Sequence, residues 1–230
     1  MCVAFLEHRA VGDFGLPIQG MLGKNFWLGA LLGLVEVSVL VGLISAFGGY
    51  AFGSFALSLG DAIRWASFYF ALFLVVGLYE EFLFRGYAQF TLGQSIGFWP
   101  AAVLLSAFFG YVHLGNKGET WTGAAGVVLV GLLFAFTLRR TGNLWFAIGL
   151  HASFDWGETF LYSVPDSGEV FRGHLSHALL SGPQWLTGGT AGPEGSIFCF
   201  ITMGLQFLVV ALIFPAKQST DGDSLRTLPI

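Results

Sequence analysis

The stretch LVVGLYEEFLFRGYAQF, residues 74–90, places three ionisable side chains inside an otherwise apolar run. They are Glu80, Glu81 and Arg85. Burying each of these groups in an apolar environment is costly, and an ionisable side chain within a membrane segment is by default a sign of function. The stretch therefore raises two questions: whether the chain lies in a membrane, and what the three side chains do there.

The composition indicates a membrane protein. Of the 230 residues, 55% are hydrophobic, 10% are charged and 25 are Phe, and the mean hydropathy is +0.73. Soluble domains carry about a quarter charged residues. The apolar runs are continuous and approach the ~20 residues that span a bilayer, unlike the short alternating strands of a barrel. Since backbone groups in lipid must pair within helices or closed barrels, we expect an all-α fold, a polytopic integral membrane helical bundle.

The apolar runs predict about six transmembrane helices within a single domain, 26–214. The spans are expected at 26–48, 65–90, 98–113, 121–138, 143–162 and 196–214. The segment 1–25 before them is expected to lie at the membrane interface. Between the last two spans, 164–195 is rich in Gly, Pro and Ser and predicts an extramembrane loop. The final residues, 215–230, are polar and predict a disordered tail.

The distribution of positive charges predicts the orientation in the membrane. An even number of spans leaves both termini on one side, and that side carries six Lys or Arg residues: Arg9, Lys24, Arg139, Arg140, Lys217 and Arg226. The opposite loops carry three: Arg64, Lys117 and Arg172. Because cytoplasmic loops are enriched in Lys and Arg, both termini are expected in the cytoplasm. In a bacterium this would be the cell membrane.

The sequence indicates neither a nucleic-acid partner nor a site built from cysteines. The formal net charge is −4, and no basic patch suited to nucleic acid is present in the sequence. Cys2 and Cys199 are isolated and predict neither a disulfide framework nor a cysteine metal site. The partners to expect are therefore membrane lipid and whatever substrate the polar residues within the spans recognise.

Helical geometry places the three ionisable residues of the opening stretch on two different faces of the helix. Residues four apart share a helix face, whereas adjacent residues diverge by about 100°. Glu81 and Arg85 can therefore pair, while Glu80 faces Phe84 four residues later and has no local partner. A carboxylate without a partner in a low-dielectric site is a candidate proton acceptor. A salt bridge tying two helices together is the alternative, although it leaves Glu80 unexplained.

A histidine is expected at the same depth as Glu80. Glu80 precedes the turn expected near residue 95 by fifteen positions, and His113 follows it by eighteen. At ~1.5 Å per residue, both lie about 22–27 Å from the same turn on antiparallel helices, so they can meet. Phe109 lies one turn before His113 and could pack against its ring. An interfacial histidine at a helix end is the alternative.

The run LHASFDWGE adds a second histidine in the fifth span. His151 and Asp155 are four residues apart and share a face, which Glu158 continues. The pair could simply satisfy itself, yet an intramembrane His and Asp are by default functional candidates. Glu158, nearer the helix exit, is expected to be solvated.

Together these residues predict a hydrolytic site. A carboxylate base with two imidazoles and a further oxygen can hold and deprotonate a water, and imidazoles can stabilise an oxyanion or bind a metal such as zinc. The candidate metal ligands are His113, His151, Asp155 and Glu80. The helical HExxH zinc motif is absent from the sequence, so no cofactor is established.

Three motifs in this order resemble one family. EExxxR at 80–85, FxxxH at 109–113 and HxxxD at 151–155 lie on successive hydrophobic spans. This pattern is similar to that of the CPBP family of CAAX-processing and bacteriocin-processing intramembrane proteases, also called the Abi or type II CAAX prenyl endopeptidase (Rce1-like) family. The resemblance covers 65–160, and members of that family usually carry more hydrophobic sequence before the first span than this chain does.

The resemblance implies peptide-bond hydrolysis within the membrane, on a peptide or lipidated protein substrate. It implies that Glu80 activates water and that Glu81, steadied by Arg85, orients the neighbouring histidine. His113 and His151 would hold the water or the oxyanion. Asp155 occupies a position that is Asn or Asp in the family, and both a metalloprotease and a metal-free glutamate mechanism have been argued for it. The residues Arg85 and Phe109 would support the site structurally.

Two other classes of function remain open at this stage. One is a non-catalytic membrane protein of the same family, such as a scaffold or a bacteriocin-immunity-type factor. The other is an ion or proton carrier using Glu36, Glu80 and the histidines, although the sequence lacks the discontinuous or repeated helices common in transporters. A hydrogen bond to a neighbouring helix is the plain interpretation of Glu36.

Overall fold

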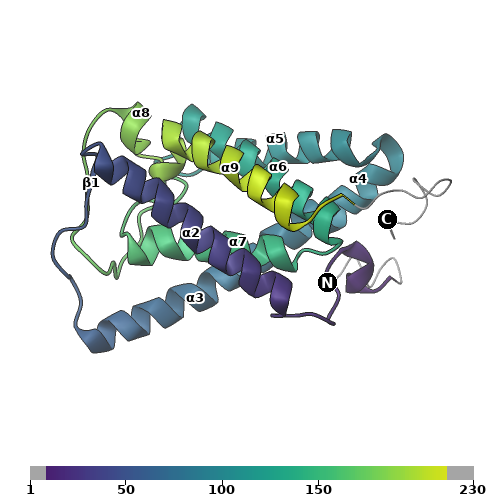
Figure 1. The fold of residues 1–230 in the computed structure, drawn as a ribbon, viewed down its shortest axis with the longest axis horizontal. Coiled ribbons are helices and arrows are strands. Elements are labelled where there is room, and N and C mark those ends of the chain that lie inside the picture. The colour runs from purple at the N-terminus through teal and green to yellow at the C-terminus, as the bar shows by residue number, and fades with distance from the viewer. Residues whose placement is uncertain (1–8, 217–230) are drawn as a thin grey trace.

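The computed structural model describes residues 9–216, and within them the chain is a bundle of helices (Figure 1). The principal helices are α2 Lys24–Ala46, α3 Leu59–Glu81, α4 Gln89–Ile96, α5 Phe98–His113, α6 Trp121–Thr141, α7 Trp145–Trp156 and α9 Ile197–Ile213. Short elements complete the fold: η1 Val11–Phe14, α8 Gln184–Thr187 and η4 Pro193–Gly195, with the two-residue strands β1 Tyr50–Ala51 and β2 Leu179–Leu180. The predicted all-α class is confirmed.

Each of the six predicted spans contains a helix, but their lengths differ. The helices at 24–46, 59–96 and 121–141 are long and apolar enough to cross a membrane, and 98–113 and 197–213 are shorter apolar helices. The predicted span 65–90 is part of the longer helical segment 59–96, which stops at Gly97. A positive φ of 87° at Gly97 reverses the chain there, a conformation open to glycine without steric cost. Six membrane crossings therefore remain a prediction.

The outer faces of the bundle are apolar. Exposed large hydrophobic side chains occur along α2 and α9, among them Leu31, Val35, Leu208 and Leu212. The chain is an integral membrane protein, because such faces suit hydrocarbon as solvent. The start of α2 and the end of α9 lie at the same end of the bundle in Figure 1.

Helix α7 is the centre of the bundle and packs against α2, α3 and α6. Glycines let α2 and α7 approach closely. A Cβ at Gly29 would lie 2.1 Å from the carbonyl oxygen of Phe146, and one at Gly149 would lie 2.1 Å from that of Phe26. Small residues allow this close backbone approach in membrane helix pairs. The contact fixes the helix that carries two of the predicted site residues.

Two of the three helices that carry predicted site residues, α3 and α7, change to π-helix at their ends. The segment η2, Phe82–Ala88, follows the two glutamates at the end of α3, and η3, Gly157–Leu161, follows the end of α7. A π-helix bonds i to i+5 and is found mostly as short interruptions, frequently at functional sites. The helical register of each segment therefore shifts immediately after its site residues.

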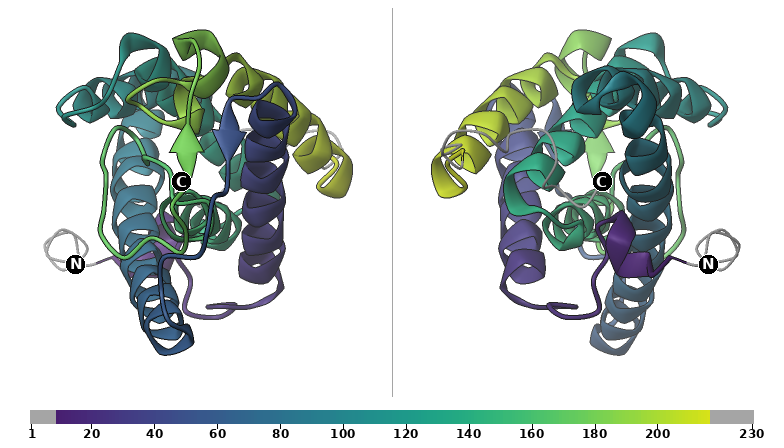
Figure 2. Two further views of the ribbon diagram at one scale, coloured as in Figure 1. Left: turned by 90° about the vertical axis from the view of Figure 1, so that its left-hand side faces the viewer. Right: turned by 90° about the vertical axis from the view of Figure 1, so that its right-hand side faces the viewer.

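The predicted extramembrane loop, 164–195, folds over one end of the bundle (Figure 2). Its strand β2 pairs antiparallel with β1, with Tyr50 opposite Leu180. The backbone N–H of Ala56 also donates to the carbonyl of Leu175 at 3.0 Å. These bonds hold the loop against the connection between α2 and α3, so the loop covers the bundle end.

The described part of the N-terminal segment packs on the bundle. Phe14 is fully buried and its ring lies 5.4 Å from that of Tyr87. The N–H of Leu144 donates to the carbonyl of Gly15 at 2.8 Å. Of the predicted interfacial segment, 1–8 lies outside the described residues, as does the predicted tail beyond residue 216.

Candidate active site

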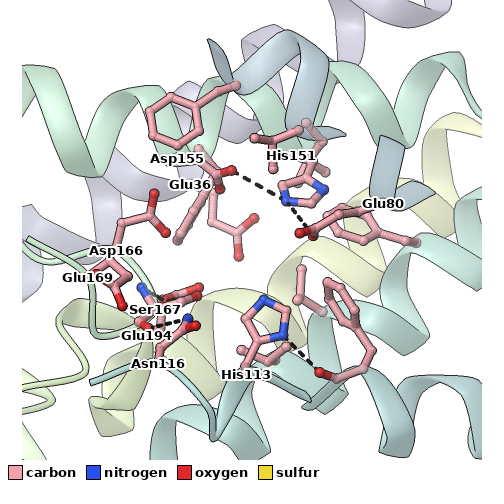
Figure 3. Close-up of a pocket in the computed structure, with 18 of the residues that line it drawn as sticks. Glu36, Glu80, His113, Asn116, His151, Asp155, Asp166, Ser167, Glu169 and Glu194 are labelled. Atoms are coloured by element: carbon pink, nitrogen blue, oxygen red, sulfur yellow. Dashed lines mark hydrogen bonds and ion pairs between the residues drawn. The ribbon is translucent and has the colours of Figure 1, made fainter. Parts of the chain in front are cut away.

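A cavity of about 250 Å³ lies inside the bundle, between the central helices and the folded loop. Figure 3 shows the polar side chains that point into it. The lining comes from α2, α3, α5, α6, α7, α9 and the loop, and its polar or charged members are Glu36, Glu80, His113, Asn116, His151, Asp155, Asp166, Ser167, Glu169 and Glu194. Four residues predicted from the sequence, Glu80, His113, His151 and Asp155, therefore line one cavity.

Glu81 lies at the centre of a buried chain of polar contacts. Its side chain is fully buried, and its Oε1 accepts from Arg85 Nη1 at 3.0 Å. The same oxygen lies 3.1 Å from His151 Nδ1. The ion pair expected from the four-residue spacing is present, and it extends to α7. Because a buried carboxylate is costly without a partner, these contacts fix Glu81 between the two helices.

Aromatic rings surround the guanidinium of Arg85. Its Cζ lies 4.2 Å from the ring centroid of Phe109 and 5.3 Å from that of Phe134. A cation over an aromatic face is attracted by the ring quadrupole, more strongly when desolvated. The rings therefore hold Arg85 in place while it pairs with Glu81.

Both ring nitrogens of His151 meet carboxylates. Nδ1 faces Glu81, and Nε2 lies 3.4 Å from Asp155 Oδ2 and 3.8 Å from Glu80 Oε2. The imidazole stacks on Phe134, with centroids 5.1 Å apart. Because a carboxylate only accepts hydrogen bonds, both ring nitrogens are placed to donate. The ring orientation is thus set by Glu81 on one side and by the stack on its face.

The two adjacent glutamates occupy different environments. The Glu81 side chain is fully buried, whereas the Glu80 side chain is 24% exposed and lines the cavity. This is the separation expected from helical geometry. Glu80 is therefore the carboxylate that can reach a molecule in the cavity.

His113 faces the cavity from the end of α5. Its Nδ1 lies 2.8 Å from the carbonyl oxygen of Phe109, and its ring meets the Phe109 ring edge-on at 4.4 Å. A carbonyl oxygen accepts only, so Nδ1 carries the hydrogen and Nε2 is the nitrogen left for other partners. In Figure 3 His113 lies on the wall that faces His151. The expected packing of Phe109 against this ring is present.

The expectation for Glu158 is wrong. Glu158 is fully buried rather than solvated at a helix exit, because the loop folds over the end of η3. Neither of its carboxylate oxygens has a hydrogen-bond partner. Its position on the same stripe as His151 and Asp155 was the available signal that it faces inward.

Sequence reasoning missed the polar residues that the loop brings to the cavity. Asp166, Ser167, Glu169 and Glu194 come from it, and Asn116 comes from the turn after α5. Their positions depend on how the loop folds, which no helical periodicity encodes. A cluster of acidic residues in an otherwise weakly charged chain was the only signal.

Burial raises the pKa of two carboxyl groups that the loop brings to the cavity. Removal from water raises the pKa of Asp166 well above its ordinary value, and negatively charged Asp155 and Glu194 add to the rise. Burial likewise raises the pKa of Glu194, while hydrogen bonding from Ser167 opposes the rise. This side of the cavity therefore gathers carboxyl groups that are costly to keep charged.

The donors predicted for zinc do not form a compact ligand set. Within the described residues, one group of three or more His, Cys, Asp or Glu side chains has its ligand atoms within 4.8 Å of one another, and it contains none of the four candidates. Each ring nitrogen of His151 instead lies next to a carboxylate, Nδ1 next to Glu81 and Nε2 next to Asp155. Catalytic zinc therefore stays a prediction.

The fold and the cavity define a helical integral membrane protein with a buried His–carboxylate site. The family described as type II CAAX prenyl endopeptidase Rce1-like matches residues 62–157. The match covers less than half of the chain, and the matched segment contains every residue predicted for the site. No curated protein and no solved structure matches the chain.

Proposed function

We propose that this protein is an intramembrane endopeptidase that hydrolyses a peptide bond in a membrane-associated or lipid-linked substrate. The observation that supports this most is the cavity shared by Glu80, His113, His151 and Asp155. The match of residues 62–157 to the Rce1-like family favours a protease. The proposal includes a multi-pass arrangement with both termini in the cytoplasm.

Glu80 is the base in this proposal. It is the glutamate of the pair that reaches the cavity, and it forms no close ion pair, its nearest being the 3.8 Å contact with His151 Nε2. Its carboxylate takes a proton from a water as the water oxygen attacks the peptide carbonyl carbon. The protonated Glu80 then gives that proton to the amide nitrogen as the C–N bond breaks. Positioned acid–base catalysis of this kind contributes about 10²–10⁴-fold in rate.

The histidines have different roles because their hydrogen bonds differ. With Nδ1 of His113 donating to Phe109, a neutral His113 presents Nε2 as an acceptor that can orient the attacking water. His151 directs Nε2 as a donor into the cavity, where it can stabilise the oxyanion of the tetrahedral intermediate. The Nδ1 atom of each imidazole contacts a fixed partner, Phe109 for His113 and Glu81 for His151, so neither ring has to reorient during the reaction.

Three residues act by positioning. Arg85 holds Glu81, and Glu81 fixes His151 through Nδ1. Asp155 lies one helical turn after His151, and its Oδ2 forms an ion-pair contact with Nε2 at 3.4 Å, which is long for a hydrogen bond. A weak contact of this kind leaves the Nε2 donor available to a developing oxyanion.

The rest of the cavity suits an apolar substrate segment. Beside the polar residues, it is lined by Leu72, Phe73, Val76, Phe154 and Phe171, among others. Burying apolar surface gives about 25 cal/mol per Å². An apolar residue or a lipid modification next to the cleaved bond would therefore bind here.

The test is proteolysis by Glu80→Gln in detergent or vesicles, across lipidated and unmodified peptides. Gln keeps the shape of Glu but cannot accept the proton, so we expect a loss of at least ~10²-fold in kcat. Asp61→Asn is the matched control, because it removes one negative charge near the start of the same helix, where Asp61 is exposed. Both variants should keep the Tm of the unaltered protein to within a few degrees.

Activity of Glu80→Gln within tenfold of the unaltered protein would overturn the assignment. If a cellular function persists in a folded Glu80→Gln variant that cleaves nothing, the non-catalytic scaffold or immunity-type role is the better description.

A further inference from the structure

A second group of carboxylates lies beside the candidate active site. Glu158 from η3, Asp166 from the loop and Glu194 from η4 each offer one carboxylate oxygen, and these oxygens all lie within 4.8 Å of one another. We call these three residues the acidic cluster. None of them has a role in the hydrolysis proposed above.

Glu158 is the residue that demands an explanation. It is fully buried, and both of its oxygens lack a hydrogen-bond partner. One of them belongs to the acidic cluster, so the carboxylate is directed toward the other two. A buried carboxylate without partners costs far more than a buried neutral group, so a positively charged partner or a proton must be present.

The other two members are held in position by neighbouring donors. Glu194 Oε2 accepts from the N–H of Ser167 at 2.6 Å and from its hydroxyl at 2.8 Å. Asp166 Oδ2 accepts from the hydroxyl of Thr159 at 3.2 Å. Ser167 has a φ of 44°, an uncommon value outside glycine. The loop conformation thus aims these carboxylates at Glu158.

No ion pair reaches the acidic cluster within the described residues. Within residues 9–216, every ion pair involves His151 or joins Arg85 to Glu81, and none reaches the three carboxylates. Three carboxylates this close repel one another, which destabilises the charged forms. The site is therefore short of positive charge.

We propose that Glu158, Asp166 and Glu194 bind a hard divalent cation, with Ca²⁺ as the best fit. All three ligands are carboxylate oxygens, which suit Ca²⁺, Mg²⁺ and Mn²⁺, whereas zinc favours nitrogen and sulfur. Two oxygens on one ion lie at most twice the metal–oxygen distance apart, about 4.6–5.2 Å for Ca²⁺ and about 4.2 Å for Mg²⁺. Oxygens that all lie within 4.8 Å of one another are close enough to share one such ion, and the longer bonds and flexible coordination geometry of Ca²⁺ favour it over Mg²⁺.

Such an ion would join the end of the catalytic helix to both ends of the folded loop. Glu158 follows Asp155 by three residues at the end of the helix that carries His151. Asp166 and Glu194 belong to opposite ends of the folded loop, and both line the cavity. The cation would tie the loop to the catalytic helix and fix one wall of the cavity. It takes no part in the proposed hydrolysis, so the two proposals can fail separately.

The experiment is calorimetric titration of the full chain in detergent after removal of bound metal with a chelator. Ca²⁺, Mg²⁺ and Mn²⁺ are each titrated, and the Tm is recorded with and without each ion. We expect one Ca²⁺ per chain, binding more tightly than Mg²⁺, and a rise in Tm because the ion binds the folded state. The absence of saturable binding by all three ions at millimolar concentration would overturn the proposal.

Matched variants locate the site. Glu158→Gln and Asp166→Asn keep side-chain shape and remove one ligand charge each, and we expect each to weaken Ca²⁺ binding by at least ~10-fold. Glu169→Gln is the control, because it removes the same charge from the same cavity but lies outside the acidic cluster. Equal weakening by Glu169→Gln would show a diffuse charge effect and overturn the site. A Glu158→Gln variant with higher Tm, from a chain that binds no ion, would show that the carboxyls hold protons.

Discussion

Replacing Arg85 with Met tests the buried chain of contacts behind the candidate active site. Met preserves an unbranched side chain that can fill the space between the rings of Phe109 and Phe134, but removes the cation. Glu81 is then left fully buried with His151 Nδ1 as its remaining partner at 3.1 Å. Its Oε2 has no hydrogen-bond partner even with Arg85 present.

The expected loss follows from the burial of the pair. Removing one member of a buried ion pair costs about 3–5 kcal/mol, because the other charge stays behind. The remaining contact with His151 places this case at the lower end, about 3 kcal/mol, or about 10²-fold in the folding equilibrium. A second change, Glu81→Gln, removes the stranded charge. The double variant should therefore be more stable than Arg85→Met alone.

Reversible unfolding in mixed micelles, followed by far-ultraviolet circular dichroism, measures these differences. Arg139→Met is the control, since Arg139 is exposed at the end of α6 and surface changes stay within about 0.5 kcal/mol. A loss below ~1 kcal/mol for Arg85→Met would refute the reasoning, because no buried charge would then depend on it. Strictly additive losses in the double variant would show that Arg85 and Glu81 do not interact.

Three further predictions concern packing and pH. Gly131→Ala would place a Cβ 2.5 Å from Arg85 Nη2, so overpacking should cost about 1–3 kcal/mol in the same unfolding assay. Gly149→Ala would place a Cβ 2.1 Å from a carbonyl oxygen of α2 and should lower the Tm, whereas Gly42→Ala, with open space around it, should leave the Tm equal or higher. Burial raises the pKa of Glu119 from 4.5 to about 7, so the folded state takes up a proton and loses stability as the pH rises through that range. Glu119→Gln should flatten this decline, measured as Tm at about pH 5 and about pH 8.

The helices and the core of the site were predictable because lipid restricts what a chain can do. Backbone groups must pair within each span, so long apolar runs become helices and ionisable residues gather in the interior. The four-residue spacings then predicted the contact between Glu81 and Arg85. Similar distances from the turn expected near residue 95 predicted that Glu80 and His113 can meet, and both line the same cavity.

The loop side of the cavity was not predictable by the same reasoning. The position of Asp166 and Glu194 depends on pairing between β1 and β2, which are about 130 residues apart in sequence, and on a positive φ at Ser167. Neither feature has a periodic signal. Glu158 was misjudged for this reason, since a helix exit looks open to water until a distant segment covers it.

The two π-helical segments have a consequence for how the chain tolerates deletions. A π turn holds one residue more than an α turn, so each segment resembles a single inserted residue absorbed by the helix. Removing one residue from η2 would allow ordinary α winding to resume, so the side chains after η2 would keep their faces, whereas a deletion in a regular α-helix would turn every later side chain by about 100° about the axis. Arg85 lies inside η2, so a deletion before it would shorten its spacing from Glu81 from four residues to three and shift the guanidinium relative to the carboxylate, whereas a deletion after it would keep the four-residue spacing. Single-residue deletions along η2 would thus separate the effect of removing the π turn from the effect of disturbing the ion pair between Arg85 and Glu81.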